Sequence, residues 1–107
     1  MRVFKLLNGA TATGAGTAVN SVAFAGLDSN KTVQVSGKTT SAAGAATVAI
    51  EVSNNGRVWL TLATVTLVLG TTETTDGFAS DAPWCFVRAN VTAISGTGAS
   101  VTAEMGA

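Results

Sequence analysis

The chain has 107 residues, in which six Lys and Arg balance six Asp and Glu and no His is present. This length suits one domain, and charged residues make up 11% of it against roughly 25% in ordinary soluble domains. No excess of positive charge exists to displace counterions from nucleic acid or to attract anionic lipids, which disfavours both as main partners. A positive mean hydropathy of +0.42 at low charge density favours an oligomer or a docked subunit over a free monomer.

Several chemistries are excluded by the residues that the sequence lacks. The single Cys85 has no second Cys to pair with, and without His neither a Ser/His nor a Cys/His catalytic pair can form. The N-terminal apolar run stops at Asn8-Gly9, too early for a signal peptide, and no run approaches the roughly 20 apolar residues of a membrane span. We therefore expect a soluble chain made in the cytosol, with no catalytic residues, no cofactor and no metal.

The N-terminal third has the weakest pattern. A faint strand is expected over Val3 to Leu7 and another over Val19 to Ala25. Between them, Gly9 to Gly16 contains only Gly, Ala and Thr, which is too little apolar bulk for a packed strand. We interpret residues 1–17 as a candidate N-terminal arm.

Period-2 alternation of apolar and polar residues dominates the centre of the chain. It predicts strands over Thr32 to Ser36, Thr47 to Ser53 and Arg57 to Ala63, each with one apolar face. Asn54-Asn55-Gly56 supplies residues that tolerate positive φ, as a tight hairpin needs.

Strands also account for most of the C-terminal part. Val65 to Leu69 is a further strand, and the hydroxyl-rich Thr71 to Gly77 is a loop or an edge strand. Trp84 to Ile94 is expected to be the longest strand, and Ala99 to Met105 closes the domain. The residues expected to face inward in these last two strands are Cys85, Val87, Ala89, Val91, Ala93, Ala99, Val101, Ala103 and Met105.

No segment shows helical periodicity, and β-branched Thr and Val are abundant. About eight short antiparallel strands in one domain, residues 1–107, predict an all-β antiparallel β-sandwich of jelly-roll or immunoglobulin-like type. The sequence leaves the strand order open.

The aromatic and basic residues are the candidates for interface or packing roles. For the two tryptophans, core packing is favoured over an exposed platform for sugar rings. Arg88 alternates with aromatic residues, so it is expected to stack on an aromatic surface or to pair with an acid at a subunit contact, with a solvated side chain as the alternative. The full candidate set is Trp59, Trp84, Phe86, Arg88, Arg57 and Phe78.

Three acids, Glu73, Asp76 and Asp81, fall close together in the sequence. Their carboxylates could in principle bind calcium or form a glycosidase pair. Their spacing matches no known calcium loop, and a Thr-rich segment gives no reason to expect a desolvated carboxyl group. A solvated loop is the favoured interpretation.

Several motifs also carry a family resemblance. They are Ser53-Asn54-Asn55-Gly56 followed by Trp59, then Asp76-Gly77-Phe78 and Ala82-Pro83-Trp84, continuing through Val87 to Val91 and Ser95 to Thr102. From about Val33 to Gly106 the chain resembles small structural proteins of tailed bacteriophages and prophages, whereas residues 1–32 match poorly.

The resemblance implies a virion component, most concretely a capsid decoration or cement protein. Such a protein would bind the major capsid protein on the capsid surface as a β-sandwich oligomer, often a trimer. The alternatives are a carbohydrate-binding or receptor-binding fibre module and a neck or tail protein of the same virion.

Overall fold

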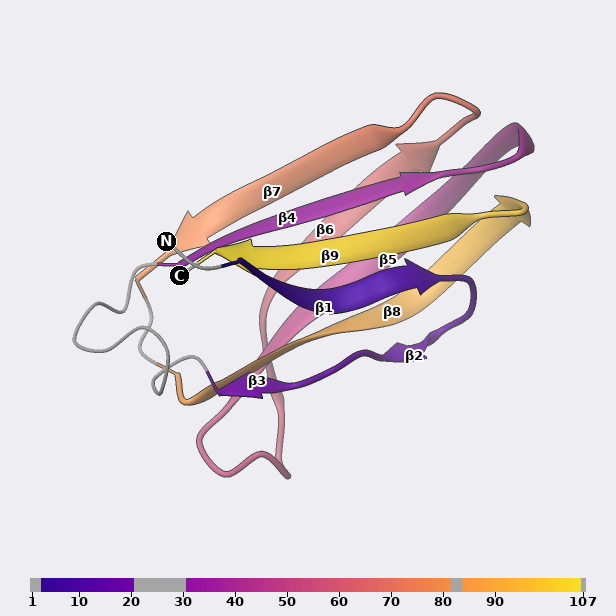
Figure 1. Cartoon of the computed structure of the whole chain (residues 1–107). Helices are drawn as coiled ribbons and strands as arrows, with labels where there is room; N and C mark the ends of the chain where they lie inside the picture. The colour runs from indigo at the N-terminus through magenta and orange to yellow at the C-terminus, as the bar shows by residue number, and fades with distance from the viewer. Residues whose placement is uncertain (1–2, 21–30, 82–83, 107) are drawn as a thin grey trace.

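The computed structural model describes residues 3–20, 31–81 and 84–106, and these residues form strands and loops without any helix. Figure 1 shows two layers of strands packed face to face. The strands in chain order are β1 (Val3–Ala10), β2 (Gly14–Ala15), β3 (Val19–Asn20), β4 (Lys31–Lys38), β5 (Ser41–Ser53), β6 (Leu60–Leu69), β7 (Thr74–Ser80), β8 (Phe86–Thr97) and β9 (Ser100–Gly106).

The two layers are antiparallel sheets. Sheet A has the order β1-β9-β4-β7, and sheet B has the order β2-β8-β5-β6, with β3 also paired to β8. Because the short strands β2 and β3 both lie along β8, they share one edge position. The sandwich therefore has eight strand positions, as the sequence predicted.

The strands pair in a nested way. The first strand, β1, pairs with the last, β9; β2 and β3 pair with β8, β4 with β7, and β5 with β6. This is the order of a jelly roll, in which a long hairpin is wound into two sheets. An immunoglobulin-like order, which places the first two strands side by side in one sheet, does not fit.

The core lies between the sheets and follows the predicted alternation. Val48, Ile50 and Val52 of β5 are at most 1% exposed, and Val87, Ala89 and Val91 of β8 meet them from the next strand. From sheet A come alternate residues of β4 and β9. These sheet A core residues are Val33, Val35, Val101, Ala103 and Met105.

The strand containing Trp84 differs from the prediction at both ends. Trp84 and Cys85 precede β8, which begins at Phe86, and Cys85 is partly exposed. At the other end, the register against β5 shifts between Thr47 and Val48, so Ala93 is exposed where inward alternation was expected. The longest strand is instead β5, with 13 residues.

The region after β5 also differs from the prediction. Residues 54–59 form a loop rather than a tight hairpin, and the two strands expected over Arg57 to Ala63 and Val65 to Leu69 are one continuous strand, β6. A register shift beside Ile50 and Glu51 places one extra β6 residue, Leu62, in a bulge. Leu62 is thereby able to pack against the core.

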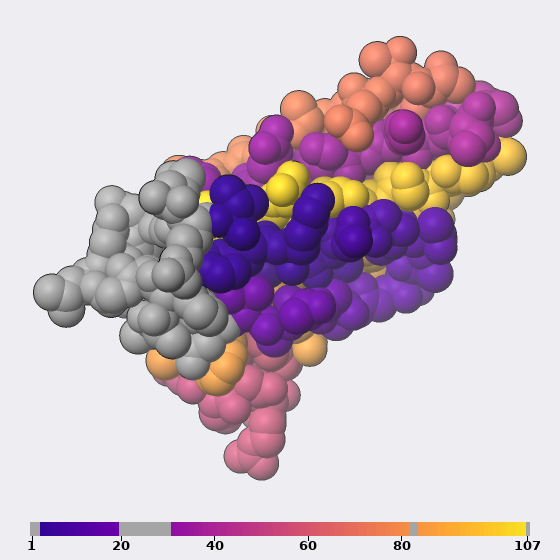
Figure 2. Space-filling model, in the orientation of Figure 1, coloured from indigo at the N-terminus to yellow at the C-terminus, as the bar shows by residue number. Residues whose placement is uncertain are grey.

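Residues 3–17 do not form an arm in this structure. Strand β1 pairs with β9 in sheet A, and β2 then pairs with β8 in sheet B. Directly after β2, the Gly16 amide donates to the Ala89 carbonyl of β8 at 2.8 Å, and the Thr17 amide donates to the Leu6 carbonyl of β1 at 3.0 Å. This segment therefore joins the two sheets along one side; we call it the seam. Figure 2 shows β1 and β2 as one continuous surface there.

Two other predictions are resolved in part. Thr74–Ser80 is the edge strand β7, which settles the alternative left open for the Thr-rich segment. Of the strand expected over Val19 to Ala25, Val19–Asn20 is β3, and residues 21–25 lie outside the described residues. In the described part of the chain, no helix has the length and apolar character needed to cross a bilayer.

Candidate interaction surface

The loop over residues 54–59 is held by a compact hydrogen-bond network. The Ser53 hydroxyl oxygen accepts from the amides of Asn55 and Gly56, at 3.2 and 2.9 Å. The Asn55 side-chain oxygen accepts from the amides of Arg57 and Val58, at 2.9 and 3.0 Å. These side chains mimic backbone turns, so the loop has a defined shape although it projects from the sandwich (Figure 2).

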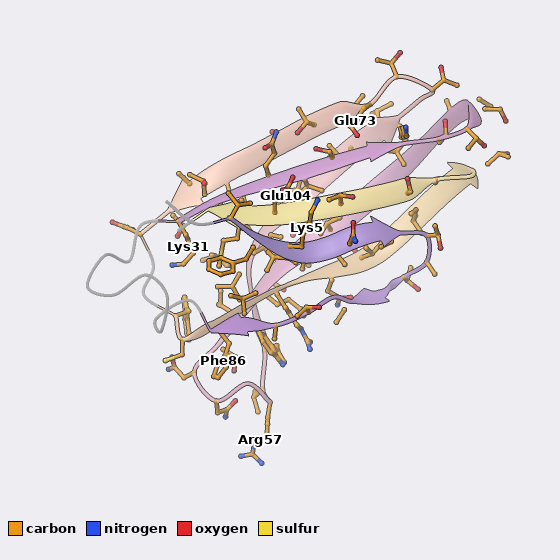
Figure 3. The ribbon with its side chains drawn as sticks, viewed as in Figure 1. Lys5, Lys31, Arg57, Glu73, Phe86 and Glu104 are labelled. Carbon is orange, nitrogen blue, oxygen red and sulfur yellow. The ribbon has the colours of Figure 1, made fainter. Side chains whose placement is uncertain are left out.

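Gly56 and Phe86 fix the loop against sheet B. Gly56 has φ of +73°, a left-handed conformation that favours glycine, and a Cβ built on it would lie 3.7 Å from the Phe86 ring. Phe86 pairs with Ser53 at the beginning of β8. The ring therefore lies beside the loop, and Figure 3 shows Arg57 at the loop tip pointing away from it.

Arg88 lies at the centre of the outer face of sheet B near this loop. Its guanidinium carbon is 4.1 Å from the centroid of the Trp59 ring, a cation–π contact. Its Nε atom donates to Glu51 Oε1 at 2.7 Å, and Asn90 donates to Glu51 Oε2 at 3.3 Å. Glu51 and Arg88 are directly opposite each other in the β5–β8 ladder, so strand register creates this pair.

We call Glu51, Trp59, Phe86, Arg88 and Asn90 the Trp59 patch. All five side chains are partly exposed, so they are accessible to a partner while holding one another in place. The Arg88 and Glu51 side chains are only 25% and 15% exposed, which strengthens their attraction relative to a surface ion pair.

Two large apolar side chains adjoin Trp59 in the chain. Val58 is 73% exposed and Leu60 is 54% exposed. They are two of the four exposed large hydrophobic residues in the described part of the chain. The register pairs Leu60 with the buried Val52 and Thr61 with Glu51, so Leu60 is on the face of sheet B opposite the patch.

The predicted candidate residues separate into two groups. Trp59, Phe86 and Arg88 come together on sheet B, with Arg57 at the adjoining loop tip. Trp84 and Phe78 instead pack against the core as partly buried residues, Phe78 from strand β7 of sheet A. The expectation that Trp59 packs in the core is wrong, because Trp59 lies on the outer face over Arg88.

Sequence reasoning did not select Glu51, Asn90 or Val58. The first two follow from the pairing of β5 with β8, which places residues 37 and 39 positions apart in contact. Val58 was expected to face inward along a strand, whereas the loop exposes it. The only local signal was the period-2 spacing of Arg88 and Asn90 beside Phe86.

The outer face of sheet A has a different character. Thr75 accepts from Gln34 and Ser36, each at 3.2 Å, and Thr102 accepts from the Gly9 amide at 3.1 Å. Lys5 and Glu104 form an exposed ion pair at 3.7 Å, visible in Figure 3. Such surface pairs contribute little, and among the described residues this face has no aromatic cluster comparable to the Trp59 patch.

The acids Glu73, Asp76 and Asp81 do not assemble a metal site. Among the described residues, no group of three or more His, Cys, Asp or Glu side chains could hold a metal ion. The Asp76 carboxylate instead accepts from the neighbouring Gly77 amide at 2.8 Å.

The fold and the Trp59 patch together define a small jelly-roll protein with a preformed aromatic and basic surface. No family model and no curated protein sequence matches the chain. Among solved structures, the fold is similar to the crystal structure of PBSX exported protein XepA, with a TM-score of 0.57 and 16% sequence identity. The similarity covers 97% of this chain and 36% of that chain, so this chain spans about a third of that protein's length.

Proposed function

We propose that the chain is a structural, non-enzymatic component of a tailed-bacteriophage particle, acting as a capsid decoration protein. In this role it binds the major capsid protein at the virion surface as a homo-oligomer and stabilises the shell. Two lines of support are independent of the surface: the resemblance of residues 33–106 to phage structural proteins, and a fold similar to that of PBSX exported protein XepA.

The Trp59 patch is the observation that carries the proposal. Trp and Arg are the residues most enriched among those that dominate protein–protein binding energy. Arg88 is already held by Glu51 and Trp59, so binding a partner immobilises little that is free beforehand. Val58 adds exposed apolar area next to Trp59 in the chain.

The low charge of the chain also favours a shell partner. A surface with few charges gains little from long-range attraction. Stable binding through a weak contact therefore needs several such contacts at once. A capsid offers many identical sites, and an oligomer bound to several of them at once gains avidity. The trimer that the resemblance implies and the two-fold contact argued in the next subsection are alternatives, and the mass in solution separates them.

A protein partner is favoured over a glycan by the geometry of Trp59. The Arg88 guanidinium lies over one face of the indole ring, so a sugar ring could pack against the opposite face only. A neck or tail protein would use the same patch and differs in copy number. Copy number per particle therefore separates the decoration role from the neck or tail role.

The test uses virions purified by density gradient from the strain that encodes this chain. Quantitative mass spectrometry is expected to find the chain in the particles at a fixed ratio to the major capsid protein, with a copy number comparable to that of the capsid subunits. A neck or tail role predicts far fewer copies per particle. Absence of the chain from purified particles would overturn a virion role altogether.

A matched pair of variants tests the surface itself. Val58→Asp places a charge beside the Trp59 patch, whereas Val3→Asp places the same charge on strand β1 of sheet A; the two valines are 73% and 62% exposed. Neither side chain is in the core, so both variants should melt like the parent. Val58→Asp is expected to lower binding to particles lacking the protein at least about ten-fold, and Val3→Asp to leave it unchanged. Equal binding by both variants would exclude the loop at residues 54–59 as part of the contact.

A further inference from the structure

The four edges of the sandwich are protected to different degrees. An unpaired edge strand invites another strand, and proteins usually block it with charges, bulges, short strands or a covering segment. Strand β1 carries Lys5 and two register shifts, and the Thr17 amide caps its Leu6 carbonyl. Strand β7 carries Asp76 and Gly77, and β2 and β3 are two residues each.

Strand β6 has few of these protections, one being the Thr74 hydroxyl that caps its Val68 carbonyl. Its ten residues, Leu60 to Leu69, include no charged residue, no Pro and no Gly. The bulge at Leu62 lies near its beginning, and the seven residues from Ala63 to Leu69 are regular and rich in β-branched side chains. In the described part of the chain, β5 is the only strand paired with β6.

The direction of the free backbone groups follows from one hydrogen bond. The Val68 carbonyl accepts from the Thr74 hydroxyl at 3.0 Å, so it points away from β5. Along an extended strand the N–H and C=O of a residue point to the same side, and the side alternates. The backbone groups of Thr64 and Thr66 therefore also point to the free edge, and those of Val65 and Leu67 bond to β5.

We propose that β6 is a self-association edge that pairs antiparallel with β6 of a second copy about a two-fold axis. In such a contact every residue meets one drawn from the same uncharged set, so no like charges are opposed. The chain as a whole has a net charge of zero, so two copies approach without net repulsion. A charged partner strand would find no opposite charge along β6.

The geometry restricts how two copies can pair. Residues whose backbone groups point to the free edge must meet their equivalents, so Thr64, Thr66 and Val68 lie opposite members of the same set in any allowed register. Because the Val68 carbonyl already accepts from the Thr74 hydroxyl, Thr64 and Thr66 provide the carbonyls of this set that accept from the second copy. Their side chains share the outer face of sheet B, where Thr–Thr and Thr–Val cross-strand pairs are favourable. Pairing would also cover part of Val68, which is 75% exposed and is the largest apolar exposure in the described residues.

This inference does not depend on the virion role, since it concerns a contact between copies of the chain alone. A two-fold contact joins molecules in pairs and thus predicts a dimer in solution, whereas a trimer would require a different contact. The Trp59 patch involves other residues and stays available to a second partner.

The test is the mass of the purified full chain, measured by sedimentation equilibrium over a concentration series. The expected mass is twice the chain mass of 10.6 kDa. Thr66→Lys places a charge at the edge of each copy and is expected to weaken the dimer at least about ten-fold. Thr66→Pro removes an N–H that points to the free edge and spares the bonds to β5, so it should weaken the dimer similarly without unfolding the chain.

The matched control is Thr32→Lys, which adds the same charge to an exposed Thr on the outer face of sheet A; it should leave the dimer intact. Circular dichroism and melting of all variants show whether each is folded, and Thr66→Lys keeps the test valid if Thr66→Pro does not fold. A monomeric parent, a trimer, or a dimer unaffected by Thr66→Lys would overturn the proposal. Each of these results leaves the particle-binding experiment independent.

Discussion

At the scale of single residues, Arg88 shows how one side chain is fixed by two unlike interactions. Glu51 holds one side of its guanidinium by a charge-assisted hydrogen bond, and the Trp59 ring lies against its face. Removing Glu51 or Trp59 would leave the Arg88 side chain with a less defined position. Because all three are partly exposed, their mutual contacts serve the shape of the surface more than the stability of the core.

Lys31 is a second residue whose environment is unusual. It is 5% exposed at the beginning of β4. Burial lowers the pKa of its amine from the ordinary value of 10.5, and the nearby negative charge of Asp81 partly offsets that effect. Below that lowered pKa the amine is charged in both the folded and unfolded states, so the folded state bears the cost of desolvation.

We predict that Lys31→Met is most stable relative to the parent at pH values below the lowered pKa of the folded state, where the parent buries a charged amine. The parent should gain stability relative to Lys31→Met as pH rises through that pKa toward 10.5, because the native lysine then loses its proton and its burial no longer opposes a charge. Thermal melts across this pH range measure the effect. Lys38→Met, at the exposed end of the same strand, removes the same charge without relieving burial. A parent that gains no stability relative to Lys31→Met over this pH range would refute the argument.

At the scale of elements, the seam shows why the N-terminal segment needs such small residues. Gly16 lies between the two sheets, where its amide bonds to Ala89 of sheet B. A Cβ at this position would overlap the Leu6 carbonyl oxygen of β1 and crowd the Leu7 side chain. The small residues that suggested an arm instead allow the chain after β2 to lie close to Leu6 and Leu7 of β1.

We predict that Gly16→Ala destabilises the fold by about 2–3 kcal/mol, because the backbone of β1 or of the seam must shift. Gly70→Ala is the matched control, since a Cβ at Gly70 would meet no atom within 4 Å. Denaturant unfolding of both variants gives the comparison. If the two variants unfold at the same denaturant concentration, the seam is not a tight contact.

At the scale of the whole molecule, the jelly roll brings the two ends of the described chain together. Val3 pairs with Gly106 in the β1–β9 ladder, and β1 lies beside β9 in Figure 1. In the nested order, the outermost pair is β1 with β9, and the chain between these two strands is longer than that between any other pair. Continuity between β6 and β7 is therefore less important to the architecture than the contacts across the sandwich.

A circular permutant tests this organisation. Joining the ends by a short Gly-Ser linker and opening the chain between Thr72 and Glu73, both exposed, should keep the sheet circular dichroism spectrum and cost less than about 2 kcal/mol. Opening the chain between Ala49 and Ile50 instead interrupts β5 at the core and should prevent folding. A permutant opened at Thr72 that fails to fold would contradict the nested arrangement.

Much of the fold could be predicted from local pattern, because alternation reports directly on which side of a strand is buried. The strands around Val33, Ile50 and Val101 and their inward faces were predicted in this way. The errors came where register shifts break the alternation, at Ala93 and Leu62. They also came where a side chain lies beyond the region covered by the opposite sheet, as at Val58.

The sequence by itself determined that the chain is all-β and has one core with apolar faces on alternate sides of its strands. The tertiary structure alone decided the strand order, the closure of the seam, the Glu51–Arg88–Trp59 contact and the open edge of β6. The physical reason is range: side-chain alternation is a property of neighbouring residues, whereas pairing and register depend on residues far apart in the chain, which only the folded backbone brings together.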